Sequence, residues 1–295
     1  MPTKRTILVT GPTGFIGRRL VQWLSDRGFA VRPFGRDRTG DLSGDTDWRS
    51  GLDGVDTVIH LAGRAHVMNE TESEAATVYN RINRDATEAL AEQAEAAGVR
   101  RIVFVSTSKV MGEAGGPFSA HDTPQPGDPY SRSKLDAEAA IRRRDALQSV
   151  IIRPPLVYGP GVKGNFIELL KLVDKGLPLP FSAIHNRRSL IGLGNLCDVL
   201  IEAIDCPGGV YLPSDGETPS TPELIRLIAR ALGRKQIMLP VPVPLLKAIG
   251  RLSGRSAVID RLTESFVVDG VMPGWTPQRT MAQELADTAQ WFRTR

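Results

Sequence analysis

Residues 6–10 read TILVT, and residues 11–17 that follow read GPTGFIG. The short apolar run is typical of a strand buried on both faces. After the glycine turn, apolar residues recur at helical spacing until Gly28, where a glycine is placed to end the helix. A strand, a glycine turn and a helix in this order make up the context in which such turns bind dinucleotide phosphates.

The glycine turn has the chemistry of a phosphate cradle. Small residues let the backbone approach a pyrophosphate, and the following helix offers N–H groups and the positive end of its dipole. The spacing is G-x-x-G-x-x-G, which differs from the G-x-G-x-x-G of the usual dinucleotide fingerprint. A tight turn that binds nothing is the alternative interpretation. We expect the turn to hold a cofactor through Gly11, Thr13, Gly14, Phe15, Ile16 and Gly17.

Strand-like and helix-like segments alternate through the first half of the chain. Strands are predicted at residues 30–34, 56–60, 101–105 and 150–152, and helices at 83–97 and from Asp128 onward. This βαβ repetition predicts a parallel sheet covered by helices. The fold class is therefore α/β, with a Rossmann-type doubly wound parallel sheet.

The pattern changes after Arg153, where prolines become frequent. One more helix is predicted over 192–204 and one more strand over 209–212, and residues 239–244 are expected to be a proline-rich connection. We predict a dinucleotide-binding domain over 1–158, to which residues 189–213 return. The remainder, 159–295, is predicted to form mainly a smaller C-terminal lobe that binds the substrate.

The composition excludes several classes of protein. The formal charge is only +4 and the basic residues are scattered, so nucleic-acid binding is not expected. No apolar run has the length of a membrane span. The two cysteines, Cys197 and Cys206, lack metal-ligand spacing, which argues against a metal site and a disulfide framework and favours a cytoplasmic location.

A tyrosine and a lysine are placed to act on one proton. Tyr130 and Lys134 are four residues apart in a predicted helix and therefore share a face. A tyrosine is a poor base at its usual pKa of about 10, but a neighbouring ammonium and a cationic nicotinamide favour the phenolate. The alternative is an unrelated surface pair, because Tyr-x-x-x-Lys is common by chance.

Other candidate residues follow the predicted strands. A hydroxyl-rich stretch, 106–112, follows the strand at 101–105, at the edge where open α/β sheets bind their ligands. Leu61, Ala62 and Gly63 end the third strand beside the expected path of the cofactor, and Asp41 and Leu42 stand where an adenine-contacting pair would fall. Polar strand ends and surface aspartates are also common without any function.

These features, together with RPPLVYGP at 153–160, resemble the extended short-chain dehydrogenases/reductases over essentially the whole chain. Within that superfamily the chain resembles the NAD-dependent epimerase/dehydratase group. The similarity is greatest to a bacterial branch of UDP-glucose 4-epimerase-like proteins that includes UDP-N-acetylquinovosamine dehydrogenases, which reduce a 4-keto sugar. The stretches HVMNE at 66–70 and NRRSL at 186–190 are particularly similar to that branch.

The resemblance implies roles for individual residues. Thr107 takes the family's catalytic Ser/Thr place and bonds the reacting oxygen, Tyr130 is the acid/base, and Lys134 holds the nicotinamide ribose and lowers the tyrosine pKa. Pro154 to Val157 flank the nicotinamide. The substrate residues implied are Thr107, Ser108, Lys109, Asn165 and Arg188, of which the last two hold the diphosphate of a nucleotide sugar; arginine can donate twice to phosphate oxygens.

Three departures from the family pattern matter. Met111 stands where relatives usually have tyrosine. Ser108 and Lys109 replace the Asp-Glu pair of 4,6-dehydratases, which argues against dehydration. The stretch from Asp269 to Trp275 is shortened, which bears on the C-terminal side of the sugar site.

The cofactor is expected to be NAD(P)(H), with a slight preference for NADP(H). NAD-preferring sites usually place a carboxylate at the end of the second strand, but Gly35 stands at the expected position. Arg36 can pair with a 2′-phosphate there. Asp37, one residue on, is the alternative contact to the ribose if the strand ends later than expected.

The leading interpretation is hydride transfer at C4 of a nucleotide-activated sugar, UDP-linked by resemblance, as a 4-ketoreductase or a 4-epimerase. The alternative is a catalytically silent NAD(P)-binding sensor or scaffold. Such a protein has no need of Thr107, Tyr130 and Lys134, and all three are present. The sequence leaves a homodimer and the identity of the sugar open.

Overall fold

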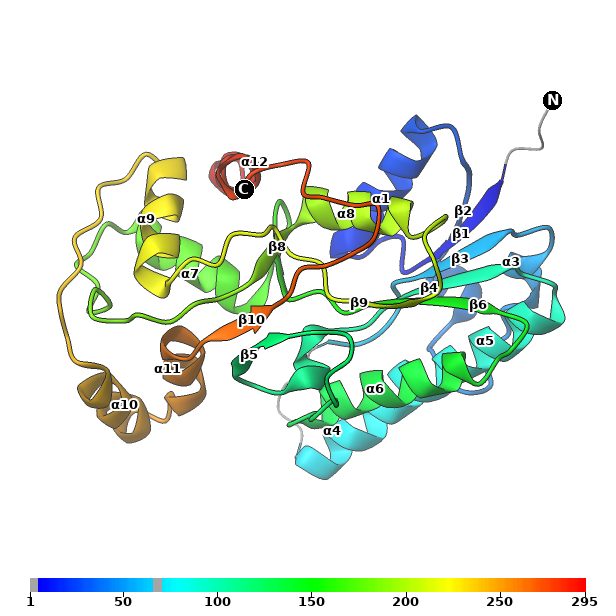
Figure 1. The fold of residues 1–295 in the computed structure, drawn as a ribbon, viewed down its shortest axis with the longest axis horizontal. Coiled ribbons are helices and arrows are strands. Elements are labelled where there is room, and N and C mark those ends of the chain that lie inside the picture. The colour runs from blue at the N-terminus through cyan, green and yellow to red at the C-terminus, as the bar shows by residue number, and fades with distance from the viewer. Residues whose placement is uncertain (1–4, 66–70) are drawn as a thin grey trace.

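The computed structural model describes residues 5–65 and 71–295, and its one large sheet lies in the right half of the view in Figure 1. Six parallel strands lie in the order β2-β1-β3-β4-β6-β9. Their bounds are Thr6–Thr10 (β1), Ala30–Phe34 (β2), Thr57–His60 (β3), Arg101–Val105 (β4), Gln148–Ile152 (β6) and Gly209–Tyr211 (β9). The predicted α/β fold with a parallel sheet is confirmed.

The strand order reverses direction at β1. The chain passes from β1 to β2 on one side and then crosses to β3 on the other side of β1. The crossovers on the two sides therefore diverge at the carboxyl ends of β1 and β3, where Thr10 is paired with His60. Open α/β sheets bind ligands in the crevice at such a switch point.

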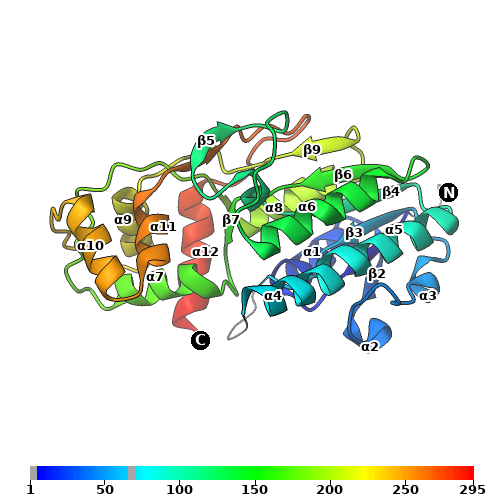
Figure 2. The ribbon, with the colours of Figure 1, turned by 90° about the horizontal axis from the view of Figure 1, so that it is seen from below.

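Helices cover both faces of the sheet (Figures 1 and 2). The helices α1 (Phe15–Asp26) and α8 (Leu193–Glu202) cover one face, and α5 (Ala86–Ala96) and α6 (Pro129–Arg142) cover the other. Ile7 and Val9 pack toward the first pair and Leu8 toward the second, and all three are fully buried. This alternation is why β1 is apolar at every position.

The helix predicted over 83–97 begins earlier than expected. It starts as α4 (Glu72–Tyr79), passes through a π-helical segment at Asn80–Asp85 and continues as α5. A capping box between Thr71 and Glu74 starts α4. The wider π turn changes the helical phase, which is why no single 3.6-residue pattern runs through all three segments.

The second half of the chain contributes a separate group of elements. Two small parallel sheets pair β7 (Leu156–Tyr158) with β8 (Leu190–Gly192) and β5 (Gly115–Phe118) with β10 (Phe266–Val268). The further helices are α7 (Gly164–Asp174), α9 (Thr221–Ala231), α10 (Val243–Leu252), α11 (Ser256–Thr263) and α12 (Met281–Arg293). A second apolar cluster, which includes Phe166 and Ile225, lies among α7, α9 and α12. The domain boundary at residue 158 stays a prediction.

One prediction about a connecting segment needs correction. Residues 239–244 were expected to form only a connection, but α10 begins at Val243. Proline is well tolerated there because the first N–H groups of a helix have no intrahelical partner.

Short helices, α2 (Arg36–Thr39) and α3 (Arg49–Leu52), link β2 to β3. Within the described ranges, no helix is long and apolar enough to cross a bilayer.

Candidate active site

The glycine turn fits closely against the end of β3. Gly11 has a φ of 66°, and a Cβ added to it would lie 3.0 Å from the backbone nitrogen of Ala62. A Cβ on Gly17 would lie 2.2 Å from the carbonyl oxygen of Gly11. Both positions therefore require glycine, because a side chain would push the turn away from the strand end.

The N-terminus of α1 is suited to an anion. Its N-cap, Gly14, has no side chain to accept from the first N–H groups, and the first turn carries no acidic residue. Arg18 donates from Nε to the carbonyl of Thr13 at 2.8 Å, which places a cation at the turn. The unpaired N–H groups and the dipole of α1 fit the pyrophosphate of a dinucleotide. Phe15 packs between the two large apolar clusters.

A chain of hydrogen bonds connects β1, β3 and α5 below the glycine turn. The Thr10 hydroxyl accepts from the N–H groups of residues 61 and 62 and donates to Nδ1 of His60 at 2.7 Å. Nε2 of His60 then donates to Thr87 at 3.0 Å, and Thr87 donates to the carbonyl of Asn83. Burial lowers the pKa of His60 to about 3. The ring is therefore neutral, as this donor order requires.

A cavity of about 230 Å³ opens at the carboxyl ends of the central strands. It brings together eight of the predicted residues: Ile16, Leu61, Gly63, Thr107, Tyr130, Lys134, Pro154 and Val157. Two further lining residues, Ser106 and Pro155, fall within the predicted stretches 106–112 and 154–157, and four had no predicted role: Arg64, Ala65, Asn83 and Val105. The cavity therefore joins the glycine-turn helix to the tyrosine and lysine.

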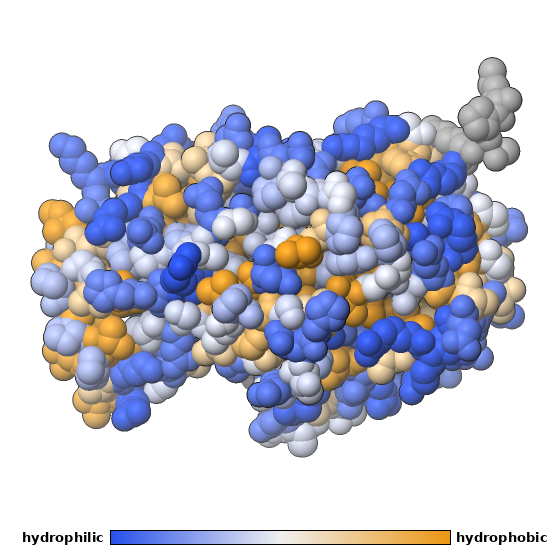
Figure 3. Space-filling view, in the orientation of Figure 1, coloured by the Kyte–Doolittle hydropathy of each residue, from blue (hydrophilic) through white to orange (hydrophobic). Residues whose placement is uncertain are grey.

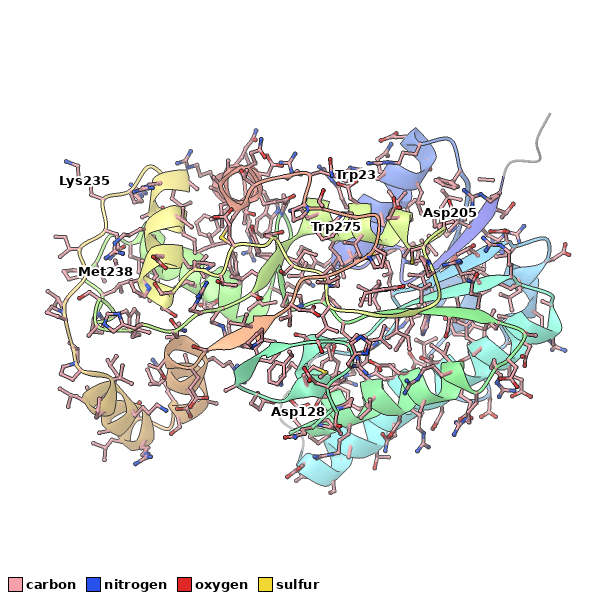
Figure 4. The ribbon with its side chains drawn as sticks, viewed as in Figure 1. Trp23, Asp128, Asp205, Lys235, Met238 and Trp275 are labelled. Atoms are coloured by element: carbon pink, nitrogen blue, oxygen red, sulfur yellow. The ribbon has the colours of Figure 1, made fainter. Side chains whose placement is uncertain are left out.

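Asp128 sets where α6 begins and hence where Tyr130 lies. Its carboxylate accepts from the N–H of Ser131 at 2.7 Å, and Ser131 in turn caps the N–H of Asp128. Pro129 occupies the first turn, as predicted. Lys109 donates to the same carboxylate. Figure 4 shows Asp128 at the entrance to the helix. The cap places Tyr130 and Lys134 on the same face of α6, toward the cavity.

Burial acts strongly on both of these side chains. Burial, together with the Asp128 charge, raises the pKa of the Tyr130 phenol above its usual range, and a hydrogen bond with Thr107 opposes this. Burial lowers the pKa of Lys134 to about 7, although Glu138 acts in the opposite sense. The Lys134 ammonium lies 4.0 Å from the centre of the Phe104 ring. Within the protein alone, burial therefore outweighs the expected effect of the lysine on the tyrosine pKa.

A buried carboxylate lies one turn beyond Lys134. Glu138 accepts from the Ser106 hydroxyl at 2.5 Å and from Nη2 of Arg153 at 2.6 Å, and its side chain is fully buried. Arg153 also donates to the sulfur of Met111 at 3.2 Å. The carboxylate therefore ties α6 to the ends of β4 and β6, next to Thr107 and Pro154. Sequence reasoning missed it, although a Glu four residues after Lys134 was visible.

The end of β2 differs from the expectation. A Cβ on Gly35 would lie 2.8 Å from Oδ1 of Asp37, so a carboxylate does stand at this strand end. This is Asp37, the alternative contact named from the sequence, which α2 turns back toward Gly35. Arg36 and Asp41 form an ion pair at 3.5 Å on the surface, and Leu42 packs beneath the sheet. None of these residues lines the cavity.

The predicted substrate residues other than Thr107 lie outside the cavity. Ser108 is buried and donates its N–H to the carbonyl of Pro154 at 2.9 Å, and Lys109 pairs with Asp128 and Glu113. Asn165 is exposed near the start of α7. Arg188 donates to the carbonyls of residues 261 and 264. Residues 66–70, part of the family resemblance, lie outside the described residues.

The stretch from Asp269 to Trp275, which the sequence predicts to be shortened, packs back on the large sheet. Met272 and Trp275 are buried in the apolar cluster shared by the sheet, α1 and α8. Figure 4 shows Trp275 near α8. The two cysteines, Cys197 and Cys206, are buried free thiols.

Comparison with known proteins gives consistent findings. A model of the NAD dependent epimerase/dehydratase family matches residues 7–205. A UDP-glucose 4-epimerase from Vibrio cholerae is 41% identical over 313 aligned positions, which cover 98% of this chain and 95% of that protein. A ceramide reductase from Caulobacter vibrioides is 30% identical over 83% of this chain and 76% of its own.

Two solved structures have the same fold. MoeE5 in complex with UDP-glucose and NAD gives a TM-score of 0.76 at 26% identity and covers 98% of this chain and 99% of its own. RMD from Pseudomonas aeruginosa, complexed with NADPH, gives a TM-score of 0.77 at 22% identity over 99% of this chain and 100% of its own. The second likeness shows the fold alone.

Proposed function

The chain belongs to the NAD-dependent epimerase/dehydratase family, and from this premise we propose that it transfers a hydride at C4 of a UDP-linked sugar. One observation carries the proposal. Thr107, Tyr130 and Lys134 line a single cavity that also reaches Ile16 in the first turn of α1. An acid/base pair and a dinucleotide cradle at one switch point are what hydride transfer between a cofactor and an alcohol requires.

The chain's own residues have separate tasks in this proposal. The bound nicotinamide supplies an acceptor for the hydride and can return it. Tyr130 holds a proton at its phenol oxygen and exchanges it with the C4 oxygen, and Thr107 orients that oxygen by a hydrogen bond. Lys134, whose pKa burial lowers to about 7, can gain or lose a proton near neutral pH beside the tyrosine. Ser106, Glu138 and Arg153 hold the walls of the cavity in place.

We propose 4-epimerisation as the first candidate and 4-keto reduction as the second. The relative from Vibrio cholerae supports the epimerase, and the sequence resemblance to 4-ketoreductases supports the second activity. An epimerase returns the hydride to the same sugar and can retain its cofactor, whereas a reductase must exchange it. Denaturing the purified protein and identifying what it releases separates these two: retained NAD supports the epimerase, and an empty site supports the reductase.

A turnover assay tests the proposal itself. We expect the protein, supplied with NAD, to convert at least one UDP-linked sugar to its C4 epimer or to the 4-keto sugar with formation of NADH. Firm cofactor binding without turnover of any UDP-linked sugar would instead support the silent sensor. The homodimer and the cytoplasmic location stay predictions.

We propose that both cofactors bind and that Asp37 favours NAD. MoeE5 was solved with NAD and RMD with NADPH, so the family fold accepts both. In this chain Asp37 stands beside Gly35 at the end of β2, where a 2′-phosphate would meet its charge. Arg36 pairs with Asp41 at 3.5 Å and Asp37 with Arg38 at 3.6 Å, both on the surface, so the position of the Asp37 carboxylate beside Gly35 carries the preference.

A further inference from the structure

The far end of the second half of the chain exposes large apolar side chains. Leu245, Ile249 and Leu252 of α10 are 53%, 51% and 91% exposed, and Val258 of α11 is 43% exposed. Figure 3 shows apolar surface over α10, at the end of the molecule opposite β1. Scattered apolar residues are normal on a surface, but several together on adjacent helices mark a contact surface.

The helical spacing separates this surface from the core. Leu245, Ile249 and Leu252 recur at four and three residues and share one face of α10. A neighbouring face of the same helix holds Leu246 and Gly250, which are buried. A Cβ on Gly250 would lie 2.7 Å from Ile259, so α11 packs directly on that inner face. The outer face of α10 is therefore apolar without contributing to the fold.

The stretch of sequence that carries this face is rich in basic residues. No Asp or Glu occurs between Glu223 and Asp260, but the same interval holds seven basic residues: Arg226, Arg230, Arg234, Lys235, Lys247, Arg251 and Arg255. Lys247 pairs with Asp260 and Glu264, and Arg234 pairs with Asp174. Arg251 and Arg255 flank Leu252, and neither forms an ion pair with a described residue. Basic charge thus remains beside the most exposed leucine.

We propose that this apolar-basic tip docks on the surface of an anionic lipid bilayer. The tip is defined by Leu245, Ile249, Arg251, Leu252, Arg255 and Val258. Its apolar side chains would enter the boundary between headgroups and acyl chains, while its arginines donate to lipid phosphates. An amphipathic helix with basic residues around its apolar face is the sequence pattern of interfacial binding.

The charge pattern favours lipid over a second copy of the chain. In a symmetric dimer the same patch serves on both subunits, so two patches that each carry Arg251 and Arg255 would meet across a desolvated contact. Anionic headgroups would compensate these charges instead. The proposal concerns only this tip, so it does not depend on which sugar the active site converts.

Co-sedimentation with vesicles tests the proposal. Two vesicle types are compared at about 0.1 M salt: pure phosphatidylcholine, and phosphatidylcholine with about 30% phosphatidylglycerol. We expect the protein to bind the anionic vesicles and to be released by about 0.5 M salt. The double variants I249D/L252D and R251E/R255E should each bind at least about tenfold more weakly.

Two control variants make the same kinds of substitution outside the tip. Val271→Asp changes an apolar side chain that is 61% exposed outside the tip, and Arg142→Glu reverses an exposed charge on α6. Both should bind anionic vesicles as the unchanged protein does, and thermal melting should show that every variant folds. Absence of binding to anionic vesicles, or equal binding by I249D/L252D, would overturn the proposal. So would a dimer that I249D/L252D dissociates while vesicles bind nothing.

Discussion

At the scale of single residues, burial sets the charge of the proposed acid/base pair. Lys134 has a pKa of about 7 in the folded chain, against an ordinary value of 10.5. Between these values an unfolded lysine holds a proton that the folded one has lost, so the free energy of unfolding rises with pH. Below pH 7 the folded and unfolded states both hold the proton, so the folded protein bears the full free-energy cost of burying the ammonium. This link between a site residue and stability can be measured without substrate.

We predict that Lys134→Met removes this pH dependence. For the unchanged protein without added cofactor, the free energy of unfolding in urea should rise by up to about 1.4 kcal/mol per pH unit between pH 7 and 9. The methionine variant should lack the rise and be more stable at pH 7. Lys175→Met, a surface control, should keep the rise. Parallel pH curves for Lys134→Met and the unchanged protein would contradict the burial argument. Tyr130 does not interfere, because its raised pKa lowers stability only above about pH 10.

A second prediction concerns cofactor choice. Asp37→Ser removes the carboxylate beside Gly35, so the affinity for NADPH relative to NADH should increase about tenfold, about 1.4 kcal/mol. Arg36→Ala should shift the ratio the other way by a smaller factor. Titration of both cofactors into cofactor-free protein measures the two ratios. An unchanged ratio in Asp37→Ser would mean that its carboxylate points away from the ribose.

The sequence identifies individual residues best where their side-chain chemistry and their spacing along the chain indicate the same site. Tyr130 and Lys134 lie together in the cavity because helical spacing alone puts them on one face. Asp37 was left as an alternative and the bonds of Glu138 to Ser106 and Arg153 were missed, because both depend on how α2 and α6 approach strand ends. No local pattern encodes such approaches.

At the scale of an element, α6 is the part on which the proposed chemistry depends. It carries Asp128 at its cap, then Tyr130, Lys134 and Glu138 along one side. Glu138 fastens the middle of the helix to Ser106 and Arg153, and both bonds are buried. A helix held at its cap and at its third turn leaves little freedom for the tyrosine between them.

We predict that Glu138→Gln lowers both stability and turnover. It leaves the Arg153 charge buried without its partner, which should cost about 3–5 kcal/mol in urea unfolding. If the variant remains folded, its kcat should fall more than its cofactor affinity, because the walls near Thr107 shift. Glu88→Gln, which breaks a surface pair with Arg143, should cost about 0–1 kcal/mol. Equal losses in the two variants would show that the buried pair contributes no more than a surface one.

Helix prediction succeeded where the capping residues mark the first turn, as at Asp128 and Pro129. It failed at α4, whose first turn is polar, and at the π-helical segment, which shifts the phase inside a continuous helix. Asn83, which lines the cavity from this segment, was therefore placed in a helix but not in the site.

At the scale of the whole molecule, the second half of the chain is expected to bind the nucleotide part of the substrate. Arg188 is assigned to the diphosphate by family resemblance, but in this structure it donates to carbonyls at the end of α11. Its position between β8 and β10, bridged to Phe266, joins segments far apart in sequence. The arginine therefore has both a structural and a proposed binding role.

We predict that Arg188→Ala raises the KM for the UDP-linked sugar at least about tenfold, as expected for loss of a charged contact to phosphate, while cofactor affinity stays unchanged. Arg187→Ala, whose neighbour is the Thr218 hydroxyl, is the matched control and should change KM little. Melting curves show whether α11 loosens. An unchanged KM in Arg188→Ala would leave this arginine a structural role only.

The large sheet was predictable because each βα unit has its own local pattern, and helices that connect successive strands imply that the strands are parallel. The small sheets were not. β5 and β10 are strands of four and three residues, and their partners, Gly115 and Phe266, are far apart in the sequence. Such short strands are defined by the contacts they make and not by their own composition.

The central claim is that the hydride moves at C4 under the control of Tyr130. The most direct measurement uses UDP-linked sugars with deuterium at C4 and follows the label by NMR and mass spectrometry. We predict that the deuterium leaves C4 and is found on the nicotinamide or at C4 of the epimer, and that Tyr130→Phe abolishes both while Tyr211→Phe does not. Label that stays on C4 of an unchanged sugar, or hydride transfer from another carbon, would contradict the claim.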